Sequence, residues 1–356
     1  MIILYPFIIA FIITALITPL SLVFIKKMGL VDDPRYHKHP AMLHKKPTPR
    51  GGGIPLFMGI VIAGIFFLPL TKAVIALFVA GSIALLLGVI DDKYDLSPYL
   101  RFVVNIAVAL IVVTAGITIP FITNPFGGIL YLNSIILPID FLGFHLPIAL
   151  SDVVAVLWII WVMNMLNWSK GVDGQMPGIV AISAVTIGLL SLRFAGSDSF
   201  SRVSVDLSFI IAGASLGFLI FNFHPAKIFP GYGATAVYLL LSAVSILSGA
   251  KLATAILVMG VPMIDGIFTI MRRVLTGRSP FWHDKKHLHH LLLSFGMGQR
   301  HIALFYWIIS AILGTLALVL GSQGKLFAII MLLIVVGGTL LFLHRVLRNT
   351  YDKDRL

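Results

Sequence analysis

The chain contains no cysteine, and only 11% of its 356 residues are charged. The absence of cysteine excludes disulfide bonds, thiolate metal sites and a cysteine nucleophile. Hydrophobic residues make up 59% of the chain and form stretches close to the roughly 20 residues that a helix needs to cross a bilayer. The composition therefore predicts an integral membrane protein, with a single domain that covers residues 1–356.

We predict an all-α fold, a polytopic transmembrane bundle of about eleven helices. Ten is the alternative count, because the division between the eighth and ninth segments is uncertain. A Pro- and Gly-containing segment, 120–148, surrounds an apolar stretch and predicts a short external β-hairpin. The predicted spans are residues 3–24, 54–70, 72–90, 101–119, 149–166, 177–194, 207–222, 235–248, 252–270, 301–320 and 325–343.

Lysine and arginine are distributed unevenly between the two sides of this bundle. If the N-terminus lies outside, the inside segments hold 21 of the 26 Lys and Arg residues and the outside segments hold the other five. Basic residues are retained on the cytoplasmic side, so we predict a cytoplasmic-membrane protein with its N-terminus outside and its C-terminus inside. The net charge of +12 then reflects orientation, with attraction to anionic lipid and phosphate as a second effect. No nucleic acid partner is expected.

The first inside loop ends in Lys46 and Arg50, followed by three glycines at 51–53. Glycines let a backbone approach a ligand closely, and the two cations suit a phosphate group. The alternative is a basic anchor on the cytoplasmic side with a flexible entry into the next helix.

The second inside loop begins with two adjacent carboxylates, Asp91 and Asp92, where a predicted helix reaches the cytoplasm. Carboxylates at this depth are costly unless they are solvated, paired or bound to a metal ion. Two neighbouring negative charges can bind Mg²⁺, or can repel until one becomes a better proton acceptor. The alternative is a solvated helix end, although the helix dipole disfavours acids there. Arg101 adds a cation nearby.

The third inside loop follows two amides, Asn164 and Asn167, which share one face of the preceding helix. Amide oxygens suit Mg²⁺, and amide groups can hydrogen-bond to a base or sugar edge. The alternative is helix capping beside turn glycines. Lys170 and Asp173 lie in the same loop and are further candidates for ligand binding.

The fifth inside loop is the most specific stretch of the sequence. It places Arg272 and other cations near three histidines within four residues, His287, His289 and His290. This pattern predicts a grip on a pyrophosphate through charge-assisted hydrogen bonds. A zinc site and a solvated basic loop are the alternatives, although histidines at this spacing rarely face one ion and no cysteine assists them. Asp265, inside a predicted helix, is interpreted as an ion-pair partner.

The order of these stretches resembles the polyprenyl-phosphate N-acetylhexosamine-1-phosphate transferases, a family within glycosyltransferase family 4. The resemblance covers nearly the whole chain, and is closer to the branch that starts O-antigen, enterobacterial common antigen and teichoic acid linkage synthesis than to the muramoyl-pentapeptide branch. The matching stretches are Lys46 to Gly53, Asp91-Asp92, Asn164 to Gly174, Phe221-Asn222 with Pro225-Ala226, and Ser279 to His290.

The resemblance implies a transfer of sugar-1-phosphate from a UDP-sugar to undecaprenyl phosphate, with Mg²⁺ and with release of UMP. Asp91 or Asp92 would position or deprotonate the lipid phosphate, which attacks the β-phosphorus of the UDP-sugar. Asp91, Asp92 and Asn167 are the expected metal ligands. The expected substrate-binding residues are Lys46, Arg50, Arg101, Asn164, Asn167, Lys170, Asp173, Arg272, His287, His289 and His290.

Two positions depart from the family pattern. Lys170 stands where the bacterial family has a carboxylate, and Tyr232 stands where the family has a metal-ligating Asp. A neutral phenol is a poor ligand for Mg²⁺. An enzyme with weaker metal dependence and an inactive homologue that binds the lipid or the nucleotide sugar are both compatible with these changes. A secondary transporter is a third alternative, and the sugar and the oligomeric state, including a homodimer, are left open.

Overall fold

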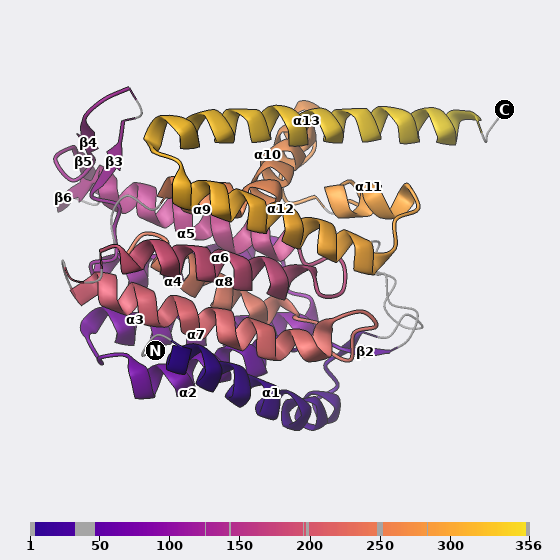
Figure 1. Cartoon of the computed structure of the whole chain (residues 1–356), viewed down its shortest axis with the longest axis horizontal. Coiled ribbons are helices and arrows are strands. Elements are labelled where there is room, and N and C mark those ends of the chain that lie inside the picture. The colour runs from indigo at the N-terminus through magenta and orange to yellow at the C-terminus, as the bar shows by residue number, and fades with distance from the viewer. Residues whose placement is uncertain are drawn as a thin grey trace.

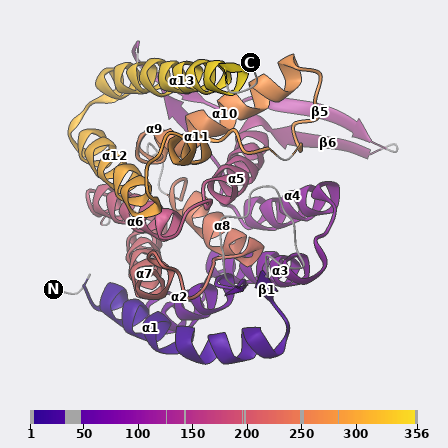
Figure 2. The ribbon, with the colours of Figure 1, turned by 90° about the vertical axis from the view of Figure 1, so that its right-hand side faces the viewer.

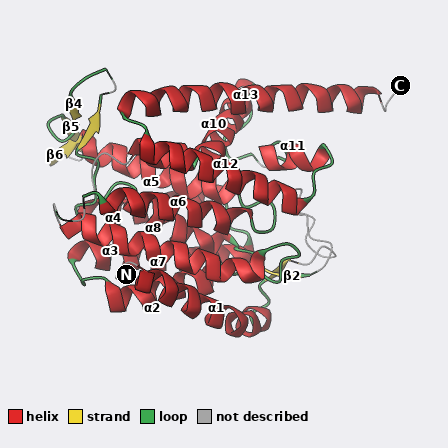
Figure 3. Cartoon of the chain, viewed as in Figure 1, coloured by secondary structure: helices red, strands yellow, loops and turns green. Residues whose placement is uncertain are grey.

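The computed structural model is mostly helical and describes residues 4–32, 47–124, 126–141, 144–194, 196, 199–247, 252–282 and 284–353. Figure 3 shows the helices as one bundle with a few short strands at its ends. The helices are α1 Leu4–Lys27, α2 Gly53–Phe67, α3 Lys72–Tyr94, α4 Pro98–Thr114, α5 Leu150–Trp168, α6 Gln175–Leu192, α7 Ser199–Asn222, the 3-10 helix η1 Tyr232–Ala234, α8 Thr235–Val244, α9 Leu252–Val258, α10 Gly260–Leu275, α11 Leu288–Ser294, α12 Gln299–Val319 and α13 Ser322–Lys353. The strands are β1 Val31–Asp32, β2 Thr48–Pro49, β3 Phe121–Thr123, β4 Ile129–Tyr131, β5 Ile136–Phe141 and β6 Phe144–Ala149.

The long helices lie side by side, with α13 along one edge and α1 and α2 at the other (Figure 1). Within the described residues, seven helices are long and apolar enough to cross a membrane, or up to eight if the bent pair α9 and α10 forms one span. The helices α2, α4 and η1–α8 are apolar but shorter. The structure is therefore that of a polytopic helical membrane protein.

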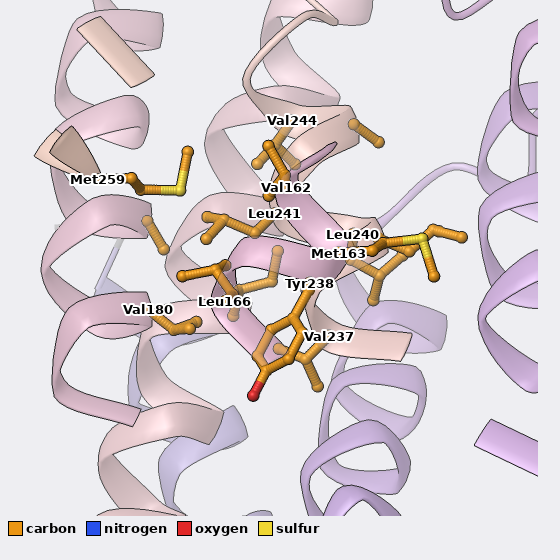
Figure 4. Packing of buried hydrophobic residues seen from close by; sticks show 14 of the residues in the cluster. Val162, Met163, Leu166, Val180, Val237, Tyr238, Leu240, Leu241, Val244 and Met259 are labelled. Carbon is orange, nitrogen blue, oxygen red and sulfur yellow. The ribbon is translucent and has the colours of Figure 1, made fainter. Parts of the chain in front are cut away.

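Helix α8 lies at the centre of the bundle, and all ten of its residues are buried. A helix that is apolar on every side is typical of such a position. Figure 4 shows its side chains, among them Tyr238 and Leu241, packed against Val162 and Leu166 of α5. By contrast, only 17% of the apolar window of α13 is buried, against 78% in α6 and α7. The outer helices thus expose apolar side chains, as expected of surfaces that face lipid.

Several predicted helices have different limits in the structure, and two of the differences have a local cause. The segment predicted as one helix, 252–270, is divided at Met259 into α9 and α10, which meet at an angle of 83°. Pro262 explains the break, because its ring would clash with the carbonyl of Val258, the last residue of α9. The helix predicted over 101–119 covers 98–114 instead, because Ser97 caps its start and Pro98 fits the first turn.

The segment predicted to form one hairpin around 129–137 contains two antiparallel strand pairs. Strand β3 pairs with β4, and β5 pairs with β6. Gly127 and Gly128 have φ angles of 128° and 81°, and these left-handed conformations allow the turn between β3 and β4. Figure 2 shows β5 and β6 extending from the bundle.

Candidate active site

The inside loops meet at the end of the bundle opposite to strands β3 to β6, where Figure 1 shows β2 and α11. The N–H groups of Gly51 and Gly52 donate to the carbonyl of Phe229, and that of Gly53 donates to Pro230. The glycines were expected to let the backbone approach a phosphate, but their N–H groups bind the fourth inside loop, residues 223–234, instead. The first and fourth loops therefore form one unit, and Figure 2 looks onto this end of the molecule.

Glycines bring three backbone segments of this unit into direct contact. A Cβ atom on Gly53 would lie 2.2 Å from the carbonyl carbon of Gly233, and a Cβ on Gly88 would lie 2.3 Å from the Gly233 Cα. Real Cβ contacts are never this short, so a larger residue would force the backbones apart. This close packing places the end of α3, and hence its two carboxylates, beside the first and fourth loops.

Asp92 lies in the middle of this unit with its side chain fully buried. Its Oδ1 accepts from Arg50 Nε at 2.9 Å and from the backbone N–H of Tyr232 at 2.8 Å. Its Oδ2 is buried and has no hydrogen-bond partner among the described residues. A buried carboxylate oxygen without a donor is costly, so Asp92 retains the capacity to accept one more proton or hydrogen bond.

Asp91 is bound more completely than its neighbour. Its Oδ2 accepts from Arg101 at 3.2 Å, and its Oδ1 accepts from the backbone N–H of Leu96 at 3.0 Å. Its backbone carbonyl accepts from the N–H of Asp95, which ends α3 in a left-handed conformation. Asp91 therefore fixes the turn between α3 and α4 and positions Arg101.

Lys170 and Tyr232 complete this cluster. Lys170 donates from Nζ to the carbonyl oxygen of Gly231 at 2.6 Å. The ring of Tyr232 lies between two cations, with Lys170 Nζ at 5.7 Å and Arg101 Cζ at 5.3 Å from its centroid. The phenol oxygen accepts from Asn105 Nδ2 at 3.2 Å. Burial, and then repulsion from Arg50, lowers the pKa of Lys170 to about 7.

The oxygen atoms that could act as metal ligands in this cluster do not fit a magnesium ion. Mg²⁺ requires near-octahedral oxygen ligation, usually with carboxylates and water. Both carboxylate oxygens of Asp91 and one of Asp92 are occupied by protein donors, and three cationic side chains surround them. In the part of the chain that the structure describes, no three His, Asp or Glu side chains are grouped so that they could hold a metal ion. Asn167 contributes one further buried oxygen, Oδ1, for which the described residues offer no hydrogen-bond partner.

The other two polar residues of the third loop have structural contacts. Asn164 donates from its amide to the carbonyl of Ile160, one turn earlier in α5. Asp173 Oδ2 lies 2.7 Å from His224 Nδ1 and accepts from the backbone N–H of Ala226 at 3.1 Å. Asp173 therefore connects the third loop to the fourth.

The predicted histidine grip adjoins the third loop. His289 packs against Gly171, where a Cβ would lie 1.9 Å from His289 Nε2. The ring of His287 stacks on that of His289 at 5.8 Å and lies 6.2 Å from Trp168. Burial, followed by repulsion from His287, lowers the pKa of His290 to about 4, and burial also lowers the pKa of His289. Both rings are therefore neutral at pH 7 and can offer one donor and one acceptor each.

The cations near the histidines are paired with Asp284. Its Oδ2 lies 3.0 Å from Arg272 and 3.2 Å from Arg273. Burial opposes the effect, but hydrogen bonding and the charges of these guanidinium groups lower the pKa of Asp284. The guanidinium of Arg273 also lies 6.0 Å from the ring of Trp168, which connects α10 to the third loop.

Asp265 holds the start of α11. Its Oδ1 accepts from the backbone N–H of Leu288 at 2.9 Å, and its Oδ2 lies 2.8 Å from His287 Nδ1. The interpretation of Asp265 as a partner for another group agrees with this geometry. The carboxylate fixes both the helix and the orientation of His287.

Replacing Asp265 by asparagine should destabilise this segment by about 1–3 kcal/mol, because one amide oxygen cannot replace two buried carboxylate acceptors. We expect a lower thermal midpoint in detergent. Asp152→Asn is the matched control, since Asp152 accepts from Ser151 in the first turn of α5 and lies away from the cluster. Equal midpoints for the two variants would contradict the role of Asp265.

The structure thus brings Arg50, Asp91, Asp92, Arg101 and Lys170 into one cluster and places the histidines beside the same loop. Lys46 lies outside the described residues. The sequence interpretation missed the packing role of Tyr232. The glycine before it was the available sequence signal of an unusual backbone conformation, and Gly231 has a φ of 68° in the structure. It also missed Asp284 as the partner of both arginines and His224 as the partner of Asp173.

The fold and this cluster define a polytopic membrane protein with a charged, partly buried site at one end of its helices. The family model described as glycosyl transferase family 4 matches residues 74–249. A probable undecaprenyl-phosphate N-acetylglucosaminyl 1-phosphate transferase of Bacillus subtilis is 33% identical, over 92% of this chain and 88% of its own length.

Two further relatives are similar over most of the chain. A decaprenyl-phosphate N-acetylglucosaminephosphotransferase of Mycobacterium tuberculosis is 33% identical, over 92% of this chain and 86% of its own length. An undecaprenyl-phosphate alpha-N-acetylglucosaminyl 1-phosphate transferase of Escherichia coli is 27% identical, over 82% of this chain and 76% of its own length. The chain therefore belongs to glycosyl transferase family 4, among the polyprenyl-phosphate N-acetylhexosamine-1-phosphate transferases.

Proposed function

We propose that the chain transfers an N-acetylhexosamine 1-phosphate from a UDP-sugar to a polyprenyl phosphate and releases UMP. The names of its relatives support this reaction and do not favour a transporter. The product would be the first lipid-linked intermediate of a cell-envelope glycan. The observation that carries the proposal is the buried Oδ2 of Asp92, which lies within a cluster of cations and accepts no hydrogen bond from the part of the chain that the structure describes.

In the proposed reaction, a phosphate oxygen of the lipid attacks the β-phosphorus of the UDP-sugar. The bond from that phosphorus to the bridging oxygen breaks, and UMP leaves with the electron pair. Asp92 Oδ2 would accept or orient the proton of the lipid phosphate, whose second pKa lies near 6. Arg50, Arg101 and Lys170 would stabilise the negative charge that develops. Asp91 is assigned a positioning role, because protein donors occupy both of its oxygens.

We also propose the membrane arrangement that this reaction requires. The seven long helices, the bent pair and the three shorter apolar helices would be the eleven spans of one domain, with the N-terminus outside and the C-terminus in the cytoplasm. The cluster around Asp92 would then face the cytoplasm, where UDP-sugars are found. Strands β3 to β6 would lie on the outer side.

The direct test is UMP release by purified protein in detergent with undecaprenyl phosphate and UDP-N-acetylglucosamine. We expect release that requires both substrates, because the attacking oxygen belongs to the lipid. Binding of either substrate by folded protein, with no UMP formed from any UDP-sugar, would identify an inactive homologue instead. Uptake of a labelled substrate into vesicles would indicate a transporter.

A further inference from the structure

The Asp92 cluster holds more positive than negative charge. Two carboxylates, Asp91 and Asp92, face three cationic groups, Arg50, Arg101 and Lys170. Resting on the proposed function, we propose that Lys170, with the two arginines, supplies the positive charge that binds the diphosphate of the nucleotide sugar without a divalent cation. The ligand class is a diphosphate ester, and the side chain of Lys170 would supply positive charge that a metal ion would otherwise supply.

The contacts of Lys170 leave it able to bind such an anion. An ammonium group has three donors, and the carbonyl of Gly231 uses one of them at 2.6 Å. The side chain is only partly buried, so the remaining donors can reach a ligand. Arg50 binds Asp92 through Nε at 2.9 Å, and 31% of its side chain is exposed, so its guanidinium group can reach the same anion.

Tyr232 gives this arrangement a fixed geometry. Its ring lies within cation–π distance of both Lys170 and Arg101, and attraction to the ring holds both cations in place. Like charges this close are unfavourable until an anion joins them. Burial, followed by repulsion from Arg50, lowers the pKa of Lys170 to about 7, and a bound diphosphate would favour the charged form of the side chain.

The same residues are unsuited to a metal ion. A phenol at 232 and an ammonium at 170 occupy positions where ligation would need oxygen anions, and the available carboxylate oxygens are mostly bound by protein donors. The two departures from the family pattern are thus complementary. Tyr232 removes a carboxylate, and Lys170 adds a cation beside the remaining acids.

The test measures UDP-N-acetylglucosamine affinity by calorimetry and Mn²⁺ binding by electron paramagnetic resonance, on purified full-length protein in detergent. We expect affinities in Mg²⁺ and in excess chelator that agree within about twofold, and no stoichiometric Mn²⁺. Lys170→Met should weaken binding by about tenfold or more, since it removes a charge-assisted contact but keeps the stem. Lys93→Met, at an exposed position at the end of α3, is the control and should bind like the wild type.

A double variant, Lys170→Asp with Tyr232→Asp, should gain Mn²⁺ binding and a requirement for metal in nucleotide binding. Stoichiometric Mn²⁺ on the wild type, together with loss of nucleotide binding in chelator, would overturn the inference and leave the transferase proposal intact. Unchanged affinity in Lys170→Met would also overturn it. Wild-type protein that is folded but binds no UDP-sugar under either condition would overturn the proposed function itself. If the double variant does not fold, the wild-type and single-variant measurements still decide.

Discussion

Replacing Asp92 by asparagine should slow UMP release by about 10²- to 10⁴-fold, the usual contribution of a positioned proton acceptor. Asparagine keeps the size of the side chain and one acceptor for Arg50 and the Tyr232 N–H. The amide carries no negative charge, and the position of Oδ2 is taken by a neutral oxygen or by an NH₂ group. The variant therefore lacks the proton acceptor. We expect the fold to survive, and the rate of UMP release at saturating substrates is the measurement.

Asp95→Asn is the control for this variant. Asp95 is exposed at the end of the same helix and has a φ of 48°, a left-handed conformation that asparagine tolerates well. Its activity should equal that of the wild type. Asp91→Asn should also lose activity, but with a lower thermal midpoint, because Arg101 loses its charged partner. Full activity in both Asp91→Asn and Asp92→Asn would eliminate the roles assigned to the pair.

Gly231→Ala should reduce UMP release by at least about tenfold and destabilise the protein by about 1–3 kcal/mol. The added Cβ would lie 2.1 Å from Asp92 Oδ2, and the φ of 68° is itself unfavourable for alanine. The methyl group must therefore displace the carboxylate or the fourth loop. Activity and the thermal midpoint in detergent are measured together.

Gly338→Ala is the matched control for Gly231→Ala, because the added methyl group would meet no other atom. Gly338 lies in α13, and nothing lies within 4 Å of the position that a Cβ would take. Alanine there should leave activity unchanged and raise stability slightly, because glycine is a poor helix former. A Gly231→Ala variant that behaves like this control would show that the contact with Asp92 has no part in the reaction.

The sequence predicted the helical segments well because each is defined locally, by a long apolar run between polar loops. Each of the eleven predicted segments overlaps a helix in the structure, and the segment 252–270 overlaps two. The bend at Met259 was missed, although Pro262 was visible, because a proline can sit in a membrane helix without breaking it. Whether it does depends on the neighbouring helices, which a local pattern does not contain.

The candidate site was predicted as a set of residue types and not as a set of contacts. The Tyr232 N–H donates to Asp92 across 140 positions, and Lys170 reaches Gly231 across 61. Such pairings depend on backbone contacts between glycines, which carry no hydropathy signal. Tyr232 was therefore interpreted only as a lost metal ligand, whereas its ring organises two cations.

The two parts of the site are attached to the bundle in different ways. Around Asp92, Gly53 and Gly88 meet Gly233 backbone to backbone, so local opening there requires separation of whole helices. The histidines sit on α11, a helix of seven residues whose first turn is held by one carboxylate, that of Asp265. The helix packs through the buried side chains of Leu288, His289, His290 and Leu291, so side-chain contacts fix its position. A change in the side chains beside α11 can therefore shift the histidines without separating the helices that meet around Asp92.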